Sequence, residues 1–165
     1  LATMALAAMT APDGRGRRHR ISMPNGDFDL IDDSYNASPV SMRAAFKVLA
    51  GATVLQGGRR IAVLGEMKEL GPASGDMHSA LAADIEAAGI DLVITSGALM
   101  AGLSEALPGI MRVAQCENSD EAADKAVDVI RPGDVILVKG SLASGMARVV
   151  EGLMALEATP RVVNG

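Results

Sequence analysis

Three short polar segments each follow an apolar run that is typical of a buried strand. Residues 32–36, 65–71 and 139–141 contain carboxylates, hydroxyls, an amide and lysines. In an open parallel sheet the carboxyl ends of the strands meet at one edge, where ligands bind. A carboxylate for ribose hydroxyls and a cation for phosphates would suit a nucleotide at such an edge. The alternative is that Asp33 and Ser141 only cap the turns that follow them.

Two other familiar site patterns are incomplete. Gly140 and Gly145 have the spacing of a phosphate-binding loop, but Met146 and Ala147 stand where that motif needs a lysine and a hydroxyl residue. Two histidines and one cysteine do not form a standard zinc site, so we expect no metal centre. We expect His78, in the first turn of a predicted helix, to be a partly exposed structural residue.

Strand and helix patterns alternate along most of the chain. Asn25-Gly26 between two short runs indicates a hairpin, and Ser38-Pro39 indicates the start of a helix. The predicted strands are residues 19–23, 27–31, 61–64, 91–95, 111–114 and 135–138. One predicted helix begins at Pro39, and the others span residues 1–9, 74–88, 98–106, 119–130 and 144–156. The alternation predicts an α/β, Rossmann-like, three-layer fold with about six strands, mostly parallel, and one antiparallel edge strand from the hairpin. The carboxyl edge would carry Asp33, Gly65, Gly97 and Lys139.

Composition favours one folded domain and excludes some function classes. The 165 residues are 49% hydrophobic and carry a net charge of −5, which gives no general attraction to nucleic acid. No apolar run reaches the length of about 20 residues that spans a membrane. The single cysteine, Cys116, excludes an internal disulfide and fits a reducing compartment. One basic run could hold phosphates or be a solvated, charged hairpin; its members are Arg15, Arg17, Arg18, His19 and Arg20.

Three segments, in order and spacing, resemble signatures of the Mur ligase family, and in particular of its MurF branch. DDSYNASP at residues 32–39, followed by Ser41-Met42, is similar to DDSYNANPxSM. LGEMKELG at 64–71, with His78 beyond it, is similar to LGDMxELG…H, and LVKGS at 137–141 is similar to LVKGSR. Ser38, Glu66 and Leu142 stand where the family usually has Asn, Asp and Arg, so any contact from that arginine is absent here.

The resemblance implies the carboxy-terminal domain, residues 14–165, of a three-domain cytoplasmic enzyme, with residues 1–13 as a linker and the tail of the central domain. Such enzymes add D-alanyl-D-alanine to UDP-N-acetylmuramoyl-tripeptide through an acyl phosphate, in the peptidoglycan synthesis that cell shape and division require. The first domain grips the UDP-sugar, and the central domain holds the P-loop and most contacts to ATP and Mg²⁺. The third domain closes over the ATP and receives the dipeptide. The isolated chain would then lack some of the residues that catalysis requires, and we expect it to be inactive.

The same resemblance assigns residues to two sides of the site. On the nucleotide side, Asp33 would contact the ribose and Tyr35 and Asn36 would lie beside it. Arg15 would reach the phosphates, with Arg17 and Arg18 as close competitors. The residues expected on the substrate side are Glu66, Lys68, Lys139, Ser141 and Ser144.

Two alternatives remain at this stage. The chain could come from another Mur ligase or from a folylpolyglutamate-type ligase, although these typically have His where Asn36 stands. It could instead be a stand-alone nucleotide-binding module. A P-loop domain encoded in frame before Leu1 would decide for a ligase.

Overall fold

A computed structural model describes residues 14–55 and 57–158 of the chain. Six strands form one sheet in the order β1-β2-β6-β3-β4-β5, and every neighbouring pair is parallel except β1 and β2. The strands are β1 (Arg17–Met23), β2 (Gly26–Asp33), β3 (Arg60–Gly65), β4 (Leu92–Ser96), β5 (Arg112–Cys116) and β6 (Val135–Lys139). The predicted mostly parallel sheet with one antiparallel edge strand is confirmed.

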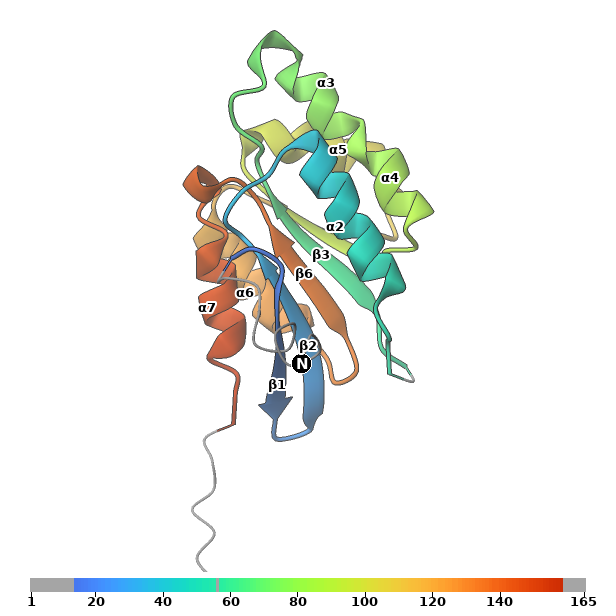
Figure 1. Cartoon of the computed structure of the whole chain (residues 1–165), viewed down its shortest axis with the longest axis vertical. Helices are drawn as coiled ribbons and strands as arrows, with labels where there is room; N and C mark the ends of the chain where they lie inside the picture. The colour runs from blue at the N-terminus through green and yellow to red at the C-terminus, as the bar shows by residue number, and fades with distance from the viewer. Residues whose placement is uncertain (1–13, 56, 159–165) are drawn as a thin grey trace, which may run out of the picture.

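Helices cover both faces of this sheet, which makes the three predicted layers (Figure 1). The longer helices are α2 (Pro39–Gly51), α6 (Ser119–Val129) and α7 (Ala147–Met154), and the shorter ones are α3 (Ser74–Ser79), α4 (Leu81–Ala87) and α5 (Ala101–Ala106). In β6 the side chains alternate: Val135 and Leu137 pack with α2, α4 and α5, whereas Ile136 and Val138 pack with α6 and α7. A strand buried on both faces reads as a continuous apolar run, as the first four residues of β6, 135–138, do.

Helix α2 is fixed at both ends by polar contacts that its sequence supplies. Ser38 caps its first turn: the Ser38 hydroxyl accepts a hydrogen bond from the Ser41 amide, and the Ser41 hydroxyl accepts one from the Ser38 amide. At the other end, the Arg60 guanidinium donates to the carbonyl oxygens of Leu49 and Ala52, at 3.1 and 2.9 Å. These bonds satisfy terminal groups that the helix cannot satisfy itself, so the start of α2 is held at the carboxyl edge of the sheet.

The structure corrects two helix predictions. The helix predicted for residues 74–88 is interrupted at Ala80, between α3 and α4. His78, predicted to be partly exposed, is fully buried, whereas the neighbouring Met77 is 38% exposed. His78 can be buried because both of its ring nitrogens have backbone partners, Met67 and Ser74.

The last helix begins at Ala147 and not at residue 144, because Gly145 has a left-handed φ of 72° that ends the preceding 3-10 turn, Leu142–Ser144. The helix predicted for residues 1–9 and the boundary predicted at residue 13 lie outside the described residues. Within the described part of the chain, no helix is long and apolar enough to cross a membrane.

The parallel strands end in register, and this brings the predicted site residues to one edge. Asp33 of β2 lies opposite Lys139 of β6, which in turn lies opposite Leu64 of β3. Gly65 lies opposite Ser96, so Gly97 directly follows the end of β4 at the same edge. The prediction that Asp33, Gly65, Gly97 and Lys139 share the carboxyl edge is confirmed.

A buried ion pair anchors the opposite edge of the sheet. The Asp134 side chain is fully buried and accepts hydrogen bonds from the Arg59 guanidinium, at 2.7 and 3.1 Å, and from the amides of Arg59 and Arg131, at 2.9 and 2.8 Å. Arg59 also donates to the Val129 carbonyl at 2.7 Å. The pair thereby joins the turn before β6 to the start of β3 and the end of α6.

We predict that Asp134→Ala lowers the free energy of unfolding by about 3–5 kcal/mol, because it leaves a cation and two amides without their acceptor. Urea denaturation of the chain would measure this. Arg43→Ala breaks the exposed Arg43–Asp84 pair and serves as the control, with an expected change below about 1 kcal/mol. Equal effects of the two variants would contradict the anchoring role of Asp134.

Candidate functional site

The central contact of the carboxyl edge is an ion pair between two neighbouring strands. The Lys139 ammonium donates to Asp33 Oδ2 at 2.8 Å and to the Asn36 carbonyl oxygen at 2.9 Å. The Lys139 side chain is 3% exposed and that of Asp33 is 22% exposed. Lys139 therefore lies beneath Asp33 and holds its carboxylate at the surface of the edge.

A pocket of about 310 Å³ opens above this pair. Its mouth is formed partly by Arg15, whose guanidinium lies over the Tyr35 ring, 4.0 Å from the ring centroid. Such a contact orients a cation while leaving its N–H groups free to bind an anion. The lining residues are Gly14, Arg15, Asp33, Tyr35, Asn36, Ser41 and Lys139. All four residues predicted for the nucleotide side, Arg15, Asp33, Tyr35 and Asn36, thus meet in one pocket.

The loop that carries Tyr35 is organised by Asp32, a residue to which sequence reasoning gave no role of its own. Asp32 is buried and accepts hydrogen bonds from the Gly14 amide at 3.1 Å, from the Ser34 amide at 3.2 Å and from the Ser34 hydroxyl at 2.6 Å. The Tyr35 amide in turn donates to the Gly14 carbonyl at 2.8 Å. The signal that could have shown this is the Asp-x-Ser spacing, which favours a turn closed by the aspartate side chain.

A second group of polar residues follows β3, β4 and β6. Glu66 Oε2 accepts a hydrogen bond from the Leu99 amide at 2.8 Å, and Oε1 accepts one from the Lys68 ammonium at 2.9 Å. A side chain at position 97 would place its Cβ 2.5 Å from Cδ of Glu66, so the close approach requires glycine there. Burial alone would raise the pKa of Glu66, but the hydrogen bonds from Lys68 and Leu99, together with the charge of Lys68, hold it below the ordinary value of 4.5.

Ser141 and Ser144 complete this second group. The Ser141 amide donates to the Glu66 carbonyl at 2.9 Å, and the Ser144 hydroxyl donates to the Ser141 carbonyl at 2.6 Å. The Ser141 hydroxyl is buried and has no hydrogen-bond partner among the described residues. A Cβ at Gly65 or Gly140 would lie 2.6 or 2.5 Å from the Ser144 hydroxyl oxygen, so both strand ends need glycine. Four of the five residues predicted for the substrate side therefore gather here, and Lys139 lies between the two groups.

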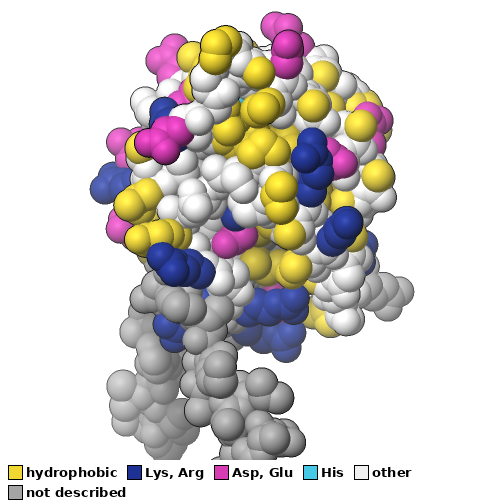
Figure 2. Space-filling view, turned by 45° about the horizontal axis from the view of Figure 1, so that its top comes forward, with side chains coloured by type: hydrophobic (Ala, Val, Ile, Leu, Met, Phe, Trp, Pro, Cys, Tyr) yellow, Lys and Arg dark blue, Asp and Glu magenta, His cyan; other side chains and the backbone are white. Residues whose placement is uncertain are grey.

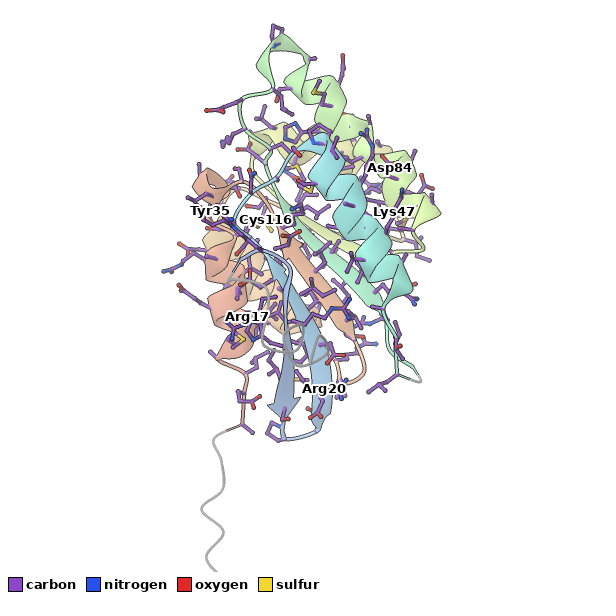
Figure 3. The ribbon with its side chains drawn as sticks, in the orientation of Figure 1. Arg17, Arg20, Tyr35, Lys47, Asp84 and Cys116 are labelled. Atoms are coloured by element: carbon purple, nitrogen blue, oxygen red, sulfur yellow. The ribbon has the colours of Figure 1, made fainter. Side chains whose placement is uncertain are left out.

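The basic run divides between different parts of the molecule. Arg15 lines the pocket at the carboxyl edge, whereas Arg18 and Arg20 line another hollow near the hairpin, where Arg20 pairs with Asp29 at 2.8 Å. Figure 3 shows Tyr35 and Arg20 toward opposite ends of the hairpin, with Arg17 between them. Of the three competing arginines, Arg15 is thus the one that lines the pocket with Asp33.

Around the carboxyl edge, apolar, basic and acidic side chains are interspersed (Figure 2). Among the described residues, no group of three or more His, Cys, Asp or Glu side chains is arranged to hold a metal ion. The chemistry available to this edge is therefore hydrogen bonding and charge: an acid and a cation at one pocket, and an acid, a cation and hydroxyls beside it.

The sheet and its two helical layers define an α/β domain of the Rossmann-like class. The chain belongs to the Mur ligase family, since residues 16–142 match the family described as the Mur ligase, glutamate ligase domain.

Two similar proteins are both UDP-N-acetylmuramoyl-tripeptide–D-alanyl-D-alanine ligases. The protein of Mycobacterium bovis is 34% identical over 171 residues, covering 92% of this chain and 34% of that protein. The protein of Escherichia coli is 36% identical over 132 residues, covering 75% of this chain and 26% of that protein. The chain thus spans about a third or less of the length of these relatives.

Solved MurF structures share the fold. MurF from Acinetobacter baumannii superposes with a TM-score of 0.76 at 28% identity, covering 88% of this chain and 31% of that one. MurF ligase from Thermotoga maritima, solved in complex with ADP, superposes with a TM-score of 0.74 at 24% identity, covering 93% of this chain and 33% of that one.

We predict a specific pH dependence for Glu66→Gln. Because the pKa of Glu66 is lowered in the folded state, its carboxylate adds stability above pH 4.5, and this is lost as pH falls through the folded-state pKa. The wild-type chain should therefore be the more stable near neutral pH, and the difference should shrink on acidification. Urea unfolding across a pH series would measure it, with exposed Glu105→Gln as the control. A difference that does not vary with pH would contradict the lowered pKa.

Proposed function

We propose that this chain is the carboxy-terminal domain of an ATP-dependent ligase that adds D-alanyl-D-alanine to UDP-N-acetylmuramoyl-tripeptide in peptidoglycan synthesis. The observation that carries the proposal is the pocket at the carboxyl edge, where Arg15, Asp33 and Tyr35 meet above Lys139. Membership of the Mur ligase family and the names of the relatives support the reaction. The MurF branch, and not another Mur or folylpolyglutamate-type ligase, is favoured by DDSYNASP and by those names.

On the nucleotide side, each pocket residue has a role that its position allows. The Asp33 carboxylate accepts hydrogen bonds from the ribose hydroxyls. Arg15, already oriented by Tyr35, binds the phosphates, and Tyr35 and Asn36 lie against the nucleoside. The Lys139 ammonium is already paired with the Asp33 carboxylate. Its role is therefore to position that carboxylate rather than to bind a phosphate itself.

On the substrate side, the incoming dipeptide is a zwitterion, with an ammonium and a carboxylate. Glu66 suits the ammonium and Lys68 suits the carboxylate, while Ser141 and Ser144 support the loop beside them. In the reaction, the carboxylate of the tripeptide attacks the terminal phosphorus of ATP, which releases ADP and forms an acyl phosphate. The dipeptide amine, after losing a proton, attacks the acyl carbon, and inorganic phosphate leaves as the peptide bond forms.

The remaining parts of the reaction fall to the rest of the polypeptide. We assign the P-loop, the Mg²⁺ ligands and the grip on the UDP-sugar to preceding domains, with residues 1–13 as the connection to a central domain. Mg²⁺ would shield the phosphate charges during transfer. The substrates place the enzyme in the cytoplasm, in cell-wall biogenesis, and no nucleic acid or membrane partner is needed.

We expect the purified 165-residue chain to turn over no ATP, because phosphoryl transfer depends on phosphates and Mg²⁺ positioned by a P-loop. Phosphate release with ATP, Mg²⁺ and D-alanyl-D-alanine would be measured. The same assay on the full-length ligase provides the positive control. Turnover by the chain that persists in the Asp33→Asn variant would show that the proposed division of labour between domains is wrong.

We predict that Asp33→Asn in the full-length ligase raises the KM for ATP by about ten- to a hundredfold, because a charge-assisted hydrogen bond is lost. The melting temperature should fall as well, because the buried Lys139 ammonium keeps an oxygen acceptor but loses its counter-charge. The KM is therefore measured at a temperature at which the variant is still folded. Asp29→Asn is the matched control: it lies on the same strand but pairs with Arg20 near the hairpin.

A lowered melting temperature for Asp33→Asn with ATP kinetics unchanged would assign Asp33 a structural role. A raised KM in both variants would instead point to a general effect on β2.

A further inference from the structure

His78 is a fully buried polar side chain outside the two groups described above. It lies on α3, which stands beside the loop that leaves β3 (Figure 1). Its Nε2 atom is 2.9 Å from the Met67 amide nitrogen, and its Nδ1 atom is 2.6 Å from the Ser74 carbonyl oxygen. The ring therefore connects this helix to the residue directly after Glu66.

These two partners fix the protonation of the ring. A backbone amide can only donate, so Nε2 must carry a lone pair to accept from Met67. A carbonyl oxygen can only accept, so Nδ1 must carry the proton that is donated to Ser74. The hydrogen bonds therefore assign Nδ1 as the donor and Nε2 as the acceptor. A ring protonated on both nitrogens would leave the buried Met67 amide without an acceptor.

The Met67 amide lies between Glu66 and Lys68, two residues of the second polar group at the carboxyl edge. Met67 itself is anchored by a fully buried side chain in the core beneath α2 to α5. On one side of it, Glu66 contacts the chain after β4 through Leu99 and the chain after β6 through Ser141. On the other side, Lys68 contacts Glu66. One bond to His78 therefore holds a residue whose neighbours join three strand ends.

We propose that His78 is a positioning residue that fixes Glu66 and Lys68 at the carboxyl edge, through its acceptor bond to the Met67 amide. The positioning itself is a structural inference. That it presents Glu66 and Lys68 to the incoming dipeptide rests on the proposed function. A histidine that merely filled the core would need no acceptor at Nε2, and an apolar ring of similar size would replace it.

Two amide substitutions separate the acceptor bond from simple packing. Gln is long enough to place an oxygen near the position of Nε2, so His78→Gln keeps an acceptor for Met67. Asn reaches only as far as Nδ1, so His78→Asn loses that acceptor although it is also a polar amide. His19→Asn on β1 is the matched control, since it makes the same replacement away from this loop.

Amide hydrogen exchange of the 165-residue chain is the first measurement. In His78→Asn we expect protection of the Met67 amide to fall by about ten- to a hundredfold. Protection of the Leu99 and Ser141 amides should fall with it, while the amides within β3 and β6 keep theirs. His78→Gln should restore the wild-type pattern, and His19→Asn should not disturb it.

Two results would overturn the proposal. Loss of protection at Met67 alone, with Leu99 and Ser141 unchanged, would show that His78 does not position Glu66. An equal fall at all amides, including those of the strands, in both His78 variants would make His78 a packing residue.

Kinetics of the full-length ligase is the second measurement, and it separates this inference from the proposed function. His78→Asn should raise the KM for D-alanyl-D-alanine and leave the KM for ATP unchanged, with rescue by His78→Gln. If hydrogen exchange follows the expected pattern while the dipeptide KM is unchanged, His78 positions the loop as proposed. That combination would overturn only the substrate-side role of Glu66 and Lys68.

Discussion

The buried ammonium of Lys139 is the contact on which the carboxyl edge depends. A lysine this deep in a protein needs an acidic partner and a further acceptor, since an unpaired charge there would be costly. Asp33 and the Asn36 carbonyl supply them from β2 and from the loop after it. The need of Lys139 for partners therefore fixes the shape of the nucleotide-side pocket, and it leaves the partly exposed Asp33 carboxylate facing outward.

Close packing imposes a second constraint on the same edge. The end of β3 and the residues directly after β4 and β6 are glycines, because the side chains of Ser144, Met146 and Glu66 occupy the space that a Cβ would need. Glu66 can then reach across to Leu99, and Ser144 can fold back onto the Ser141 carbonyl. The glycines that the sequence shows at strand ends are thus required by inward-turned polar side chains, and not only by turns.

Much of this architecture could be predicted from the sequence, because strand and helix periodicities are local signals and parallel strands must end at one edge. The start of α2 at Ser38-Pro39, for example, follows from the local sequence alone. The burial of His78 could not be predicted, because its partners, the Met67 amide and the Ser74 carbonyl, are backbone groups with no side-chain signature. The sequence predicts that Asp33 and Lys139 share an edge, but their direct pairing depends on the sheet order, because 106 residues separate the two in the chain.

The position of β6 in the sheet links the two sides of the site. It lies between β2 and β3, so its end contributes Lys139 to the pocket on one side and Ser141 to the group around Glu66 on the other. Only Gly140 separates these two residues, and its lack of a side chain lets the segment pass beneath Ser144. Any shift of this segment must therefore move Asp33 and Glu66 together, because each is bonded to it. Under the proposed function, this rigid connection would keep the nucleotide and the incoming amine in fixed relative positions.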